Sequence, residues 1–225
     1  ASAAMLRQAL VNAAAYGEAL ALHGSRTAEF RAGTRKEEPS APARDAKLEA
    51  LLPVIRGELP LIVSADRYDD IHTALRIAAE FGVRMILSHG AEAHRVAGEL
   101  AARGIPGLWG PADARYRELE SRGGGPETPA ALSRAGVKLA FQTGSIGNVA
   151  GLLEQARAAV AHGLPREEAL RALTLYPATI FGAADRLGSL EAGKAADLVV
   201  FDRDPLDGLA RVEMVFIGGE RVTTR

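Results

Sequence analysis

Polar residues that could take part in catalysis follow several short apolar runs of the chain. Ser64 and Asp66 end the run "PLIVSAD", His89 ends "RMILSHG", and Thr143 and Gly144 end "VKLAFQTG". Histidine and aspartate at such places are able to hold a divalent metal ion that activates water, or to act as general acids and bases. Only His89 and Asp66 carry side chains of that kind, so the set is sparse for such chemistry.

Composition narrows the classes of function further. The 225 residues include no cysteine, which excludes thiolate nucleophiles, disulfides and Cys-ligated zinc or iron–sulfur sites. The formal net charge of -1 gives no electrostatic reason to expect nucleic acid or an anionic membrane as partner. No apolar run approaches the ~20 residues that span a bilayer. We therefore expect a soluble protein, in the cytoplasm or in a periplasmic or secreted location, between which the sequence does not decide.

The elements that position these residues follow from a regular alternation of patterns. Short β-branched runs alternate with amphipathic helical segments, which indicates βαβ units and a parallel sheet. The predicted strands are 60–65, 83–90, 105–112 and 137–144, and the predicted helices between and after them are 69–82, 92–104, 129–136 and 148–163. Ligands bind at the carboxyl ends of such strands, so the polar residues named above are expected at one edge.

The remaining segments are simpler to interpret. Residues 3–22 have helical spacing of Ala and Leu, with Gly24 as the expected stop, and 24–46 is predicted to be a mobile loop. Asp69 is the expected N-cap of the helix that follows the first strand. Near the end of the chain, 165–183 is predicted to form two short helices, and "IGGER" is typical of the turn of a hairpin.

A longer motif lies in the same part of the chain. The string "EALRALTLYPATIFGAADRLGSLEAGKAADLVVFDRDPL" (168–206) resembles the closing segment of the amidohydrolase superfamily, and residues 45–220 are similar to its imidazolonepropionase-like members. The resemblance implies a metal-dependent (β/α)8 barrel with a small β-sandwich lobe. Because only four barrel strands are expected here, we predict the second half of such a barrel at 1–186 and part of the lobe at 187–225.

The resemblance also implies a set of metal ligands, most of which are replaced. The family uses a His-x-His pair on its first strand, which this chain does not contain, and a His on the fifth, where Ser64 stands. His89 matches the His of the sixth strand, and Gly144 stands where the catalytic Asp is expected. His89 therefore remains the candidate metal ligand, and no cofactor is expected from this chain alone. Asp66, Trp109 and Thr143 are candidates for contact with a substrate.

Three functions stay open at this point. The first is a catalytically degenerate subunit, inactive by itself, that forms an oligomer with a missing N-terminal half or with an active homologous chain. The second is a hydrolase that uses zinc or another divalent metal, with an unusual ligand set, to cleave a C–N bond in a cyclic amide, an imide or a dipeptide-like compound. The third is a small-molecule binding module.

Overall fold

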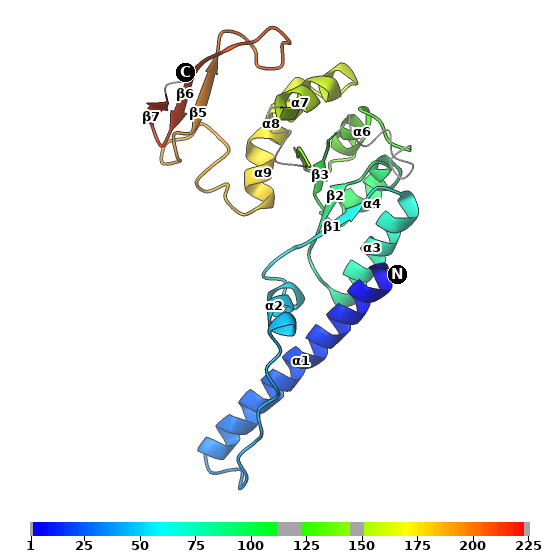
Figure 1. The fold of residues 1–225 in the computed structure, drawn as a ribbon, viewed down its shortest axis with the longest axis vertical. Coiled ribbons are helices and arrows are strands. Elements are labelled where there is room, and N and C mark those ends of the chain that lie inside the picture. The colour runs from blue at the N-terminus through cyan, green and yellow to red at the C-terminus, as the bar shows by residue number, and fades with distance from the viewer. Residues whose placement is uncertain (1, 112–122, 145–150, 223–225) are drawn as a thin grey trace. The chain divides into compact units, whose positions relative to one another are not determined.

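The computed structural model describes residues 2–111, 123–144 and 151–222 (Figure 1). The chain divides into two compact units, one formed by 1–61 with 73–85 and the other by 62–72 with 86–225. Within the described residues, no helix combines the length and the apolar character that crossing a membrane would require.

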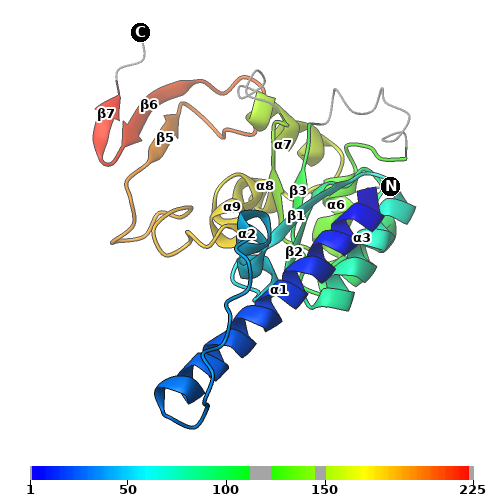
Figure 2. The same cartoon turned by 60° about the horizontal axis from the view of Figure 1, so that its bottom comes forward.

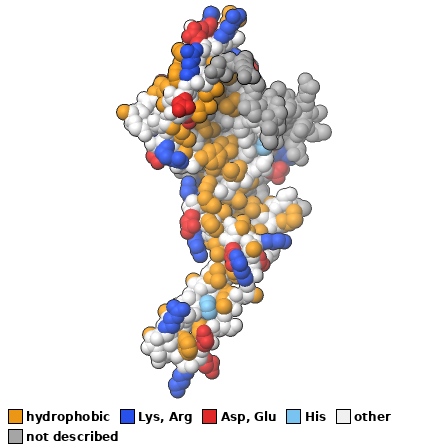
Figure 3. Space-filling view, turned by 60° about the vertical axis from the view of Figure 1, so that its left-hand side comes forward, with side chains coloured by type: hydrophobic (Ala, Val, Ile, Leu, Met, Phe, Trp, Pro, Cys, Tyr) orange, Lys and Arg blue, Asp and Glu red, His pale blue; other side chains and the backbone are white. Residues whose placement is uncertain are grey.

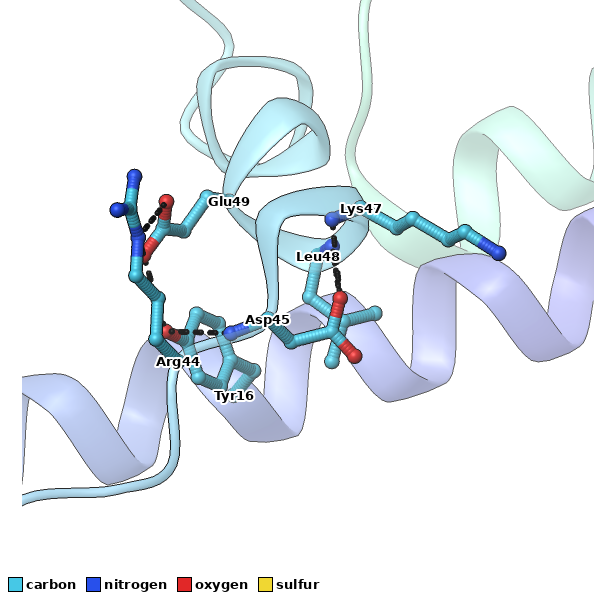
Figure 4. Close-up of polar contacts among 6 residues, drawn as sticks. All are labelled: Tyr16, Arg44, Asp45, Lys47, Leu48 and Glu49. Atoms are coloured by element: carbon cyan, nitrogen blue, oxygen red, sulfur yellow. Dashed lines mark hydrogen bonds and ion pairs between the residues drawn. The ribbon is translucent and has the colours of Figure 1, made fainter.

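Two helices dominate the first unit. Helix α1 (Ser2–Arg31) lies beside α2 (Ala46–Ile55), as Figures 1 and 2 both show. Asp45 caps α2, because its Oδ1 accepts hydrogen bonds from the backbone N–H groups of Lys47 at 2.9 Å and Leu48 at 3.1 Å (Figure 4). The hydroxyl of Tyr16 in α1 lies 3.3 Å from the Glu49 carboxylate, which links the two helices.

The predicted end of α1 is wrong. The helix continues through Gly24 to Arg31, so residues 24–31 of the expected mobile loop are helical. A single glycine lowers helix stability by roughly 1 kcal/mol without ending a helix whose other residues favour it. Gly33, with φ 75, follows the helix instead, and the Thr34 N–H then donates back to the Glu29 carbonyl. Residue 46 begins α2, and mobility of the segment from 32 to 45 stays a prediction.

The parallel sheet is confirmed. Its strands follow the order β1 (Leu61–Ala65), β2 (Met85–His89), β3 (Gly107–Trp109), β4 (Leu139–Phe141). The helices between them are α3 (Tyr68–Phe81), the short η1 (Ala93–Val96) with α4 (Ala97–Ala102), and α6 (Thr128–Arg134). Strands β3 and β4 are buried throughout, and so is β2 except at its last residue.

One face of this sheet carries the core that supports the site. Ile86, Leu108 and Ala140, one from each of β2, β3 and β4, form a buried cluster with Ile180 of α9 (Leu175–Ile180). Helices α7 (Leu152–Ala161) and α8 (Arg166–Leu173) precede α9. The two short helices predicted for 165–183 are thereby confirmed as α8 and α9.

A separate antiparallel sheet closes the described chain. It consists of β5 (Leu198–Phe201), β6 (Val212–Ile217) and β7 (Glu220–Val222). Gly218 and Gly219 join β6 to β7 with φ values of 58 and 85, which suit a two-residue hairpin turn and confirm that prediction. Hydrophobic side chains reach the molecular surface in Figure 3, and in this sheet Val199 and Ile217 are 51% and 61% exposed. The predicted domain boundary after residue 186 stays a prediction.

Candidate functional site

The ends of β1 and β2 bring Ser64 and His89 together. The Ser64 Oγ lies 2.6 Å from the His89 Nδ1, and the Gly90 N–H donates to the Ala65 carbonyl at 3.0 Å. His89 is half-buried and has a φ of 75, a backbone conformation that is uncommon outside glycine. Ser64 is exposed. The only imidazole expected at the site thus has one ring nitrogen engaged by Ser64, the residue that stands where the resemblance places a ligand.

Asp66 joins the same two strand ends through the backbone. Its Oδ1 accepts a hydrogen bond from the Ala91 N–H at 3.1 Å, and its carbonyl accepts one from the Glu92 N–H at 2.8 Å. These bonds hold the segment that follows β2 against the segment that follows β1. A role for Asp66 in substrate contact stays a prediction.

Glu92 is a residue at this edge that sequence reasoning missed. Its Oε2 accepts the N–H of Tyr68, the first residue of α3, at 2.8 Å, and it pairs with Arg95 at 3.1 Å. Asp69, the predicted cap, lies inside the first turn of α3 and pairs with Arg67 at 3.0 Å, so that prediction is wrong. The hydrogen bond from Arg67 lowers the pKa of the Asp69 carboxyl. A cap supplied from 24 residues away leaves no local signal in the sequence.

A second polar group connects the ends of β2, β3 and β4. The Gln142 Nε2 lies 3.1 Å from the Ser88 Oγ and 3.0 Å from the Gly110 carbonyl, to which it donates. The Gln155 Nε2 in turn donates to the Gln142 carbonyl at 3.1 Å. Ser88 and Gln155 are each 6% exposed. Sequence reasoning did not select these residues, although Gln142 is the first polar residue after the apolar run of β4.

Gly144 lies where the resemblance places the catalytic Asp. Its φ is 70, and a Cβ at this position would lie 2.6 Å from the Pro111 Cδ. Distances under 3.0 Å are essentially never seen for a real Cβ, so this backbone does not accommodate an aspartate. The absence of a side chain at residue 144 therefore fits the close approach of the Pro111 ring.

The remaining predicted substrate contacts differ in exposure. Trp109 is 3% exposed and packs edge-on against Phe141, with ring centroids 6.1 Å apart. This position favours packing in the core. Thr143 is half-buried, next to Gly144. Contact of either residue with a substrate stays a prediction.

Three further histidines lie in or at the end of helical segments. His162 is the C-cap residue of α7, and its Nδ1 lies 2.8 Å from the Ala158 carbonyl, a contact within its own helix end. His72 is exposed on α3, with its ring centroid 5.9 Å from that of Tyr68, and His94 is exposed in η1.

The described residues do not fit the metal that the resemblance implies. Zinc in catalytic sites takes three protein ligands and a water molecule. Across 2–111, 123–144 and 151–222, no three His, Asp or Glu side chains gather in a way that would hold an ion. The His89 Nδ1 is hydrogen-bonded to Ser64, and Gly144 has no side chain to supply a ligand atom.

Comparison with known proteins identifies the family. Residues 1–222 match the sequence profile described as "Amidohydrolase family". The chain belongs to the amidohydrolase family. The crystal structure of an amidohydrolase from Thermotoga maritima MSB8 superposes with a TM-score of 0.87 at 34% identity, covering 99% of this chain and 56% of that one. The family resemblance and the α/β fold predicted from the sequence are thereby confirmed.

Two curated relatives are covered by this chain over a smaller share of their length than the Thermotoga maritima structure is. Amidohydrolase tasK of Hapsidospora irregularis is 28% identical over 184 residues, which is 78% of this chain and 18% of the relative. The imidazolonepropionase of Mesorhizobium japonicum is 33% identical over 156 residues, 64% of this chain and 35% of the relative. The chain thus spans about half of the solved structure and about a third or less of these relatives.

Proposed function

We propose that this amidohydrolase-family chain is a catalytically degenerate subunit, which completes or supports an assembly with an N-terminal half or an active homologous chain. The observation that carries the proposal is Gly144. It has no side chain where the family resemblance requires the catalytic carboxylate, and a Cβ there would lie 2.6 Å from the Pro111 Cδ. Loss of that group removes both a ligand and the proton carrier for the leaving nitrogen.

The polar groups that remain are used to join strand ends. Ser64 contacts His89, Asp66 accepts from the backbone after β2, and Gln142 links Ser88 to the Gly110 carbonyl. Hydrogen bonds of this kind stabilise a fold by about 1 kcal/mol each. They support a structural function for this edge of the sheet.

An exposed side of β1 supports the assembly. Parallel sheets are normally covered on both faces. In the sheet described here β1 is an outer strand, where Ile62 is 50% exposed and Ser64 is exposed as well. An apolar side chain on an outer strand of a parallel sheet is a place where a further strand or chain would pack.

Native mass spectrometry with metal analysis, on protein purified from its own source, tests this function. We expect a complex that contains a second chain, with the metal and the hydrolytic activity in that chain. A single polypeptide that carries one or two metals at full occupancy and hydrolyses a C–N bond would overturn the proposal.

A metal-dependent hydrolase is the second candidate. It is favoured by the family match and by a relative named N-substituted formamide deformylase from Arthrobacter pascens, 54% identical over 41 residues. In this case zinc or another divalent metal would use His89 with ligands outside the described residues. Replacement His89→Ala would then remove metal and turnover of a cyclic amide or dipeptide-like substrate together. A ligand that raises the Tm without turnover would instead indicate a binding module.

A further inference from the structure

We infer that the Pro111 ring, which follows a Gly110 packed against Gln142 and Gln155, blocks a side chain at residue 144, so that placing His at 64 and Asp at 144 does not by itself create a metal site. The inference rests on the proposed function, since it concerns why the positions at which the resemblance places metal ligands do not hold a metal. The inference concerns which residues prevent a metal from binding. The proposed function concerns the activity and the assembly of the unmodified chain.

The first step is the contact between Pro111 and Gly144. A Cβ on Gly144 would lie 2.6 Å from the Pro111 Cδ and 3.2 Å from its Cγ. A long side chain would rotate away from such a contact, but the pyrrolidine ring is rigid and fixed to its own backbone. Relief therefore requires the backbone at Pro111 or at Gly144 to move.

The second step is the packing behind Pro111. At Gly110, which has a φ of 124, a Cβ would lie 2.1 Å from the Gln155 Oε1 and 2.3 Å from the Gln142 carbonyl oxygen. The backbone of Gly110 thus lies directly against both glutamines, and its carbonyl accepts the Gln142 Nε2 at 3.0 Å.

Gln155 makes this arrangement stiff. It is 6% exposed, and its Nε2 donates to the Gln142 carbonyl at 3.1 Å. Close-packed interiors transmit strain rather than absorb it. Gln142 and Gln155 therefore restrict movement of Gly110, the residue that precedes Pro111.

The opposite side of the site presents a smaller obstacle. Ser64 engages the His89 Nδ1 at 2.6 Å, and replacement of Ser64 removes that hydrogen bond, which leaves the longer contact of 3.4 Å between the same nitrogen and the Ser88 Oγ. The barrier to a three-ligand site with His at 64, His89 and Asp at 144 lies at Pro111. Aspartate is among the residues that tolerate a positive φ, so the backbone at 144 is the lesser problem once the ring is gone.

Zinc binding by three variants of the full chain tests the inference. The first carries Ser64→His with Gly144→Asp, the second adds Pro111→Gly, and the control carries Pro111→Gly alone. Calorimetric titration with zinc and native mass spectrometry measure affinity and stoichiometry, and circular dichroism checks folding. We expect the triple variant to bind one zinc about tenfold or more tightly than the double variant. The control is expected to behave as the wild type.

Two results would overturn the inference. Equal zinc affinity of the double and triple variants would show that Pro111 is no barrier. A folded triple variant that binds no more zinc than the control would show that the exclusion lies elsewhere. Tight zinc binding by the unmodified chain would instead count against the proposed function, so the two failures are distinguishable.

A thermal-stability cycle covers the case in which the triple variant does not fold. Gly144→Ala is expected to lower the Tm by about 10 °C in the wild-type chain, because it adds overpacking to backbone strain. In a Pro111→Gly background the same replacement should lower the Tm by less than half as much, since only the backbone strain of a positive φ at residue 144 remains. Equal losses in both backgrounds would contradict the contact on which the inference depends.

Discussion

The two sheets of this protein are stabilised in different ways. The parallel sheet buries β3 and β4 completely and joins them to Ile86 of β2 and Ile180 of α9. The antiparallel sheet has no fully buried residue in β5, β6 or β7. Hydrophobic burial therefore accounts for the first sheet, and the second must depend more on hydrogen bonds in its connections.

Aspartates provide those hydrogen bonds in the antiparallel sheet. Asp202 accepts the Arg211 N–H at 2.9 Å between β5 and β6, and Asp204 accepts the Leu206 N–H at 2.8 Å. Arg166 of α8 donates to Asp204 at 3.0 Å, which ties the connection to a helix. The difference between the sheets teaches that the one bearing the candidate site buries its strands β2, β3 and β4 within this chain, whereas the strands of the other have no fully buried residue.

The largest effect is expected from a matched pair of isoleucines in the parallel sheet. Ile86 is 2% exposed and Ile62 is 50% exposed. We expect Ile86→Ala to lower the free energy of unfolding by about 3–4 kcal/mol, and Ile62→Ala by less than about 1 kcal/mol. Urea denaturation measures both. Similar losses would mean that β1 is covered as well as β2 and would break the distinction within this sheet.

Acid should separate the two sheets. The backbone hydrogen bond from Arg211 lowers the pKa of Asp202 and the hydrogen bond from Arg166 lowers that of Asp204, both from 3.8. The stability from these carboxylates is fully present above 3.8 and is lost as pH falls through the lowered values. We expect the amide NMR signals of β5 and β6 to lose dispersion in that window, while the fluorescence of Trp109, the single tryptophan, stays native.

Two variants provide the control for the acid experiment. Asp202→Asn and Asp204→Asn should remove the pH dependence of the β5 and β6 signals, because the amide does not titrate in this range. A simultaneous change of Trp109 fluorescence and of these signals would contradict separate stabilisation of the sheets.

A smaller effect is expected on the exposed face of the antiparallel sheet. Ile217 is 61% exposed, so Ile217→Ser should change the free energy of unfolding of the isolated chain by about 0.5 kcal/mol or less. In the proposed assembly the same variant should weaken association, measured by analytical ultracentrifugation, if the partner covers this sheet. A loss of several kcal/mol in the isolated chain would show that Ile217 is already packed.

The smallest effect on thermal stability is expected from treatment with a metal chelator. Neither sheet has a described group of three metal-ligating side chains. Overnight dialysis against a chelator should therefore shift the Tm of this chain by less than about 1 °C. By comparison, removal of a ligand whose free concentration is a hundred times its Kd lowers the free energy of unfolding by about 2.7 kcal/mol. A drop of several degrees that zinc reverses would favour the hydrolase candidate.

Local patterns predicted most elements because a period of two or of 3.6 residues is a property of neighbouring residues. The runs at 60–65, 83–90, 105–112 and 137–144 all became strands of one sheet, although β3 and β4 are shorter than predicted. Where prediction failed, a distant or competing group decided. Gly33 ended α1 in place of Gly24, and Glu92 capped α3 in place of Asp69.

The sequence by itself determined the fold class and the family, and it predicts that Ser64 and Gly144 stand where two metal ligands are expected. Only the tertiary structure decided what surrounds those positions. The Ser64–His89 hydrogen bond joins residues 25 apart, the Ser88–Gln142 bond joins residues 54 apart, and Pro111 fills the space beside Gly144. Such contacts depend on where strand ends meet, to within a few tenths of an ångström, and no local pattern of residue types encodes that distance.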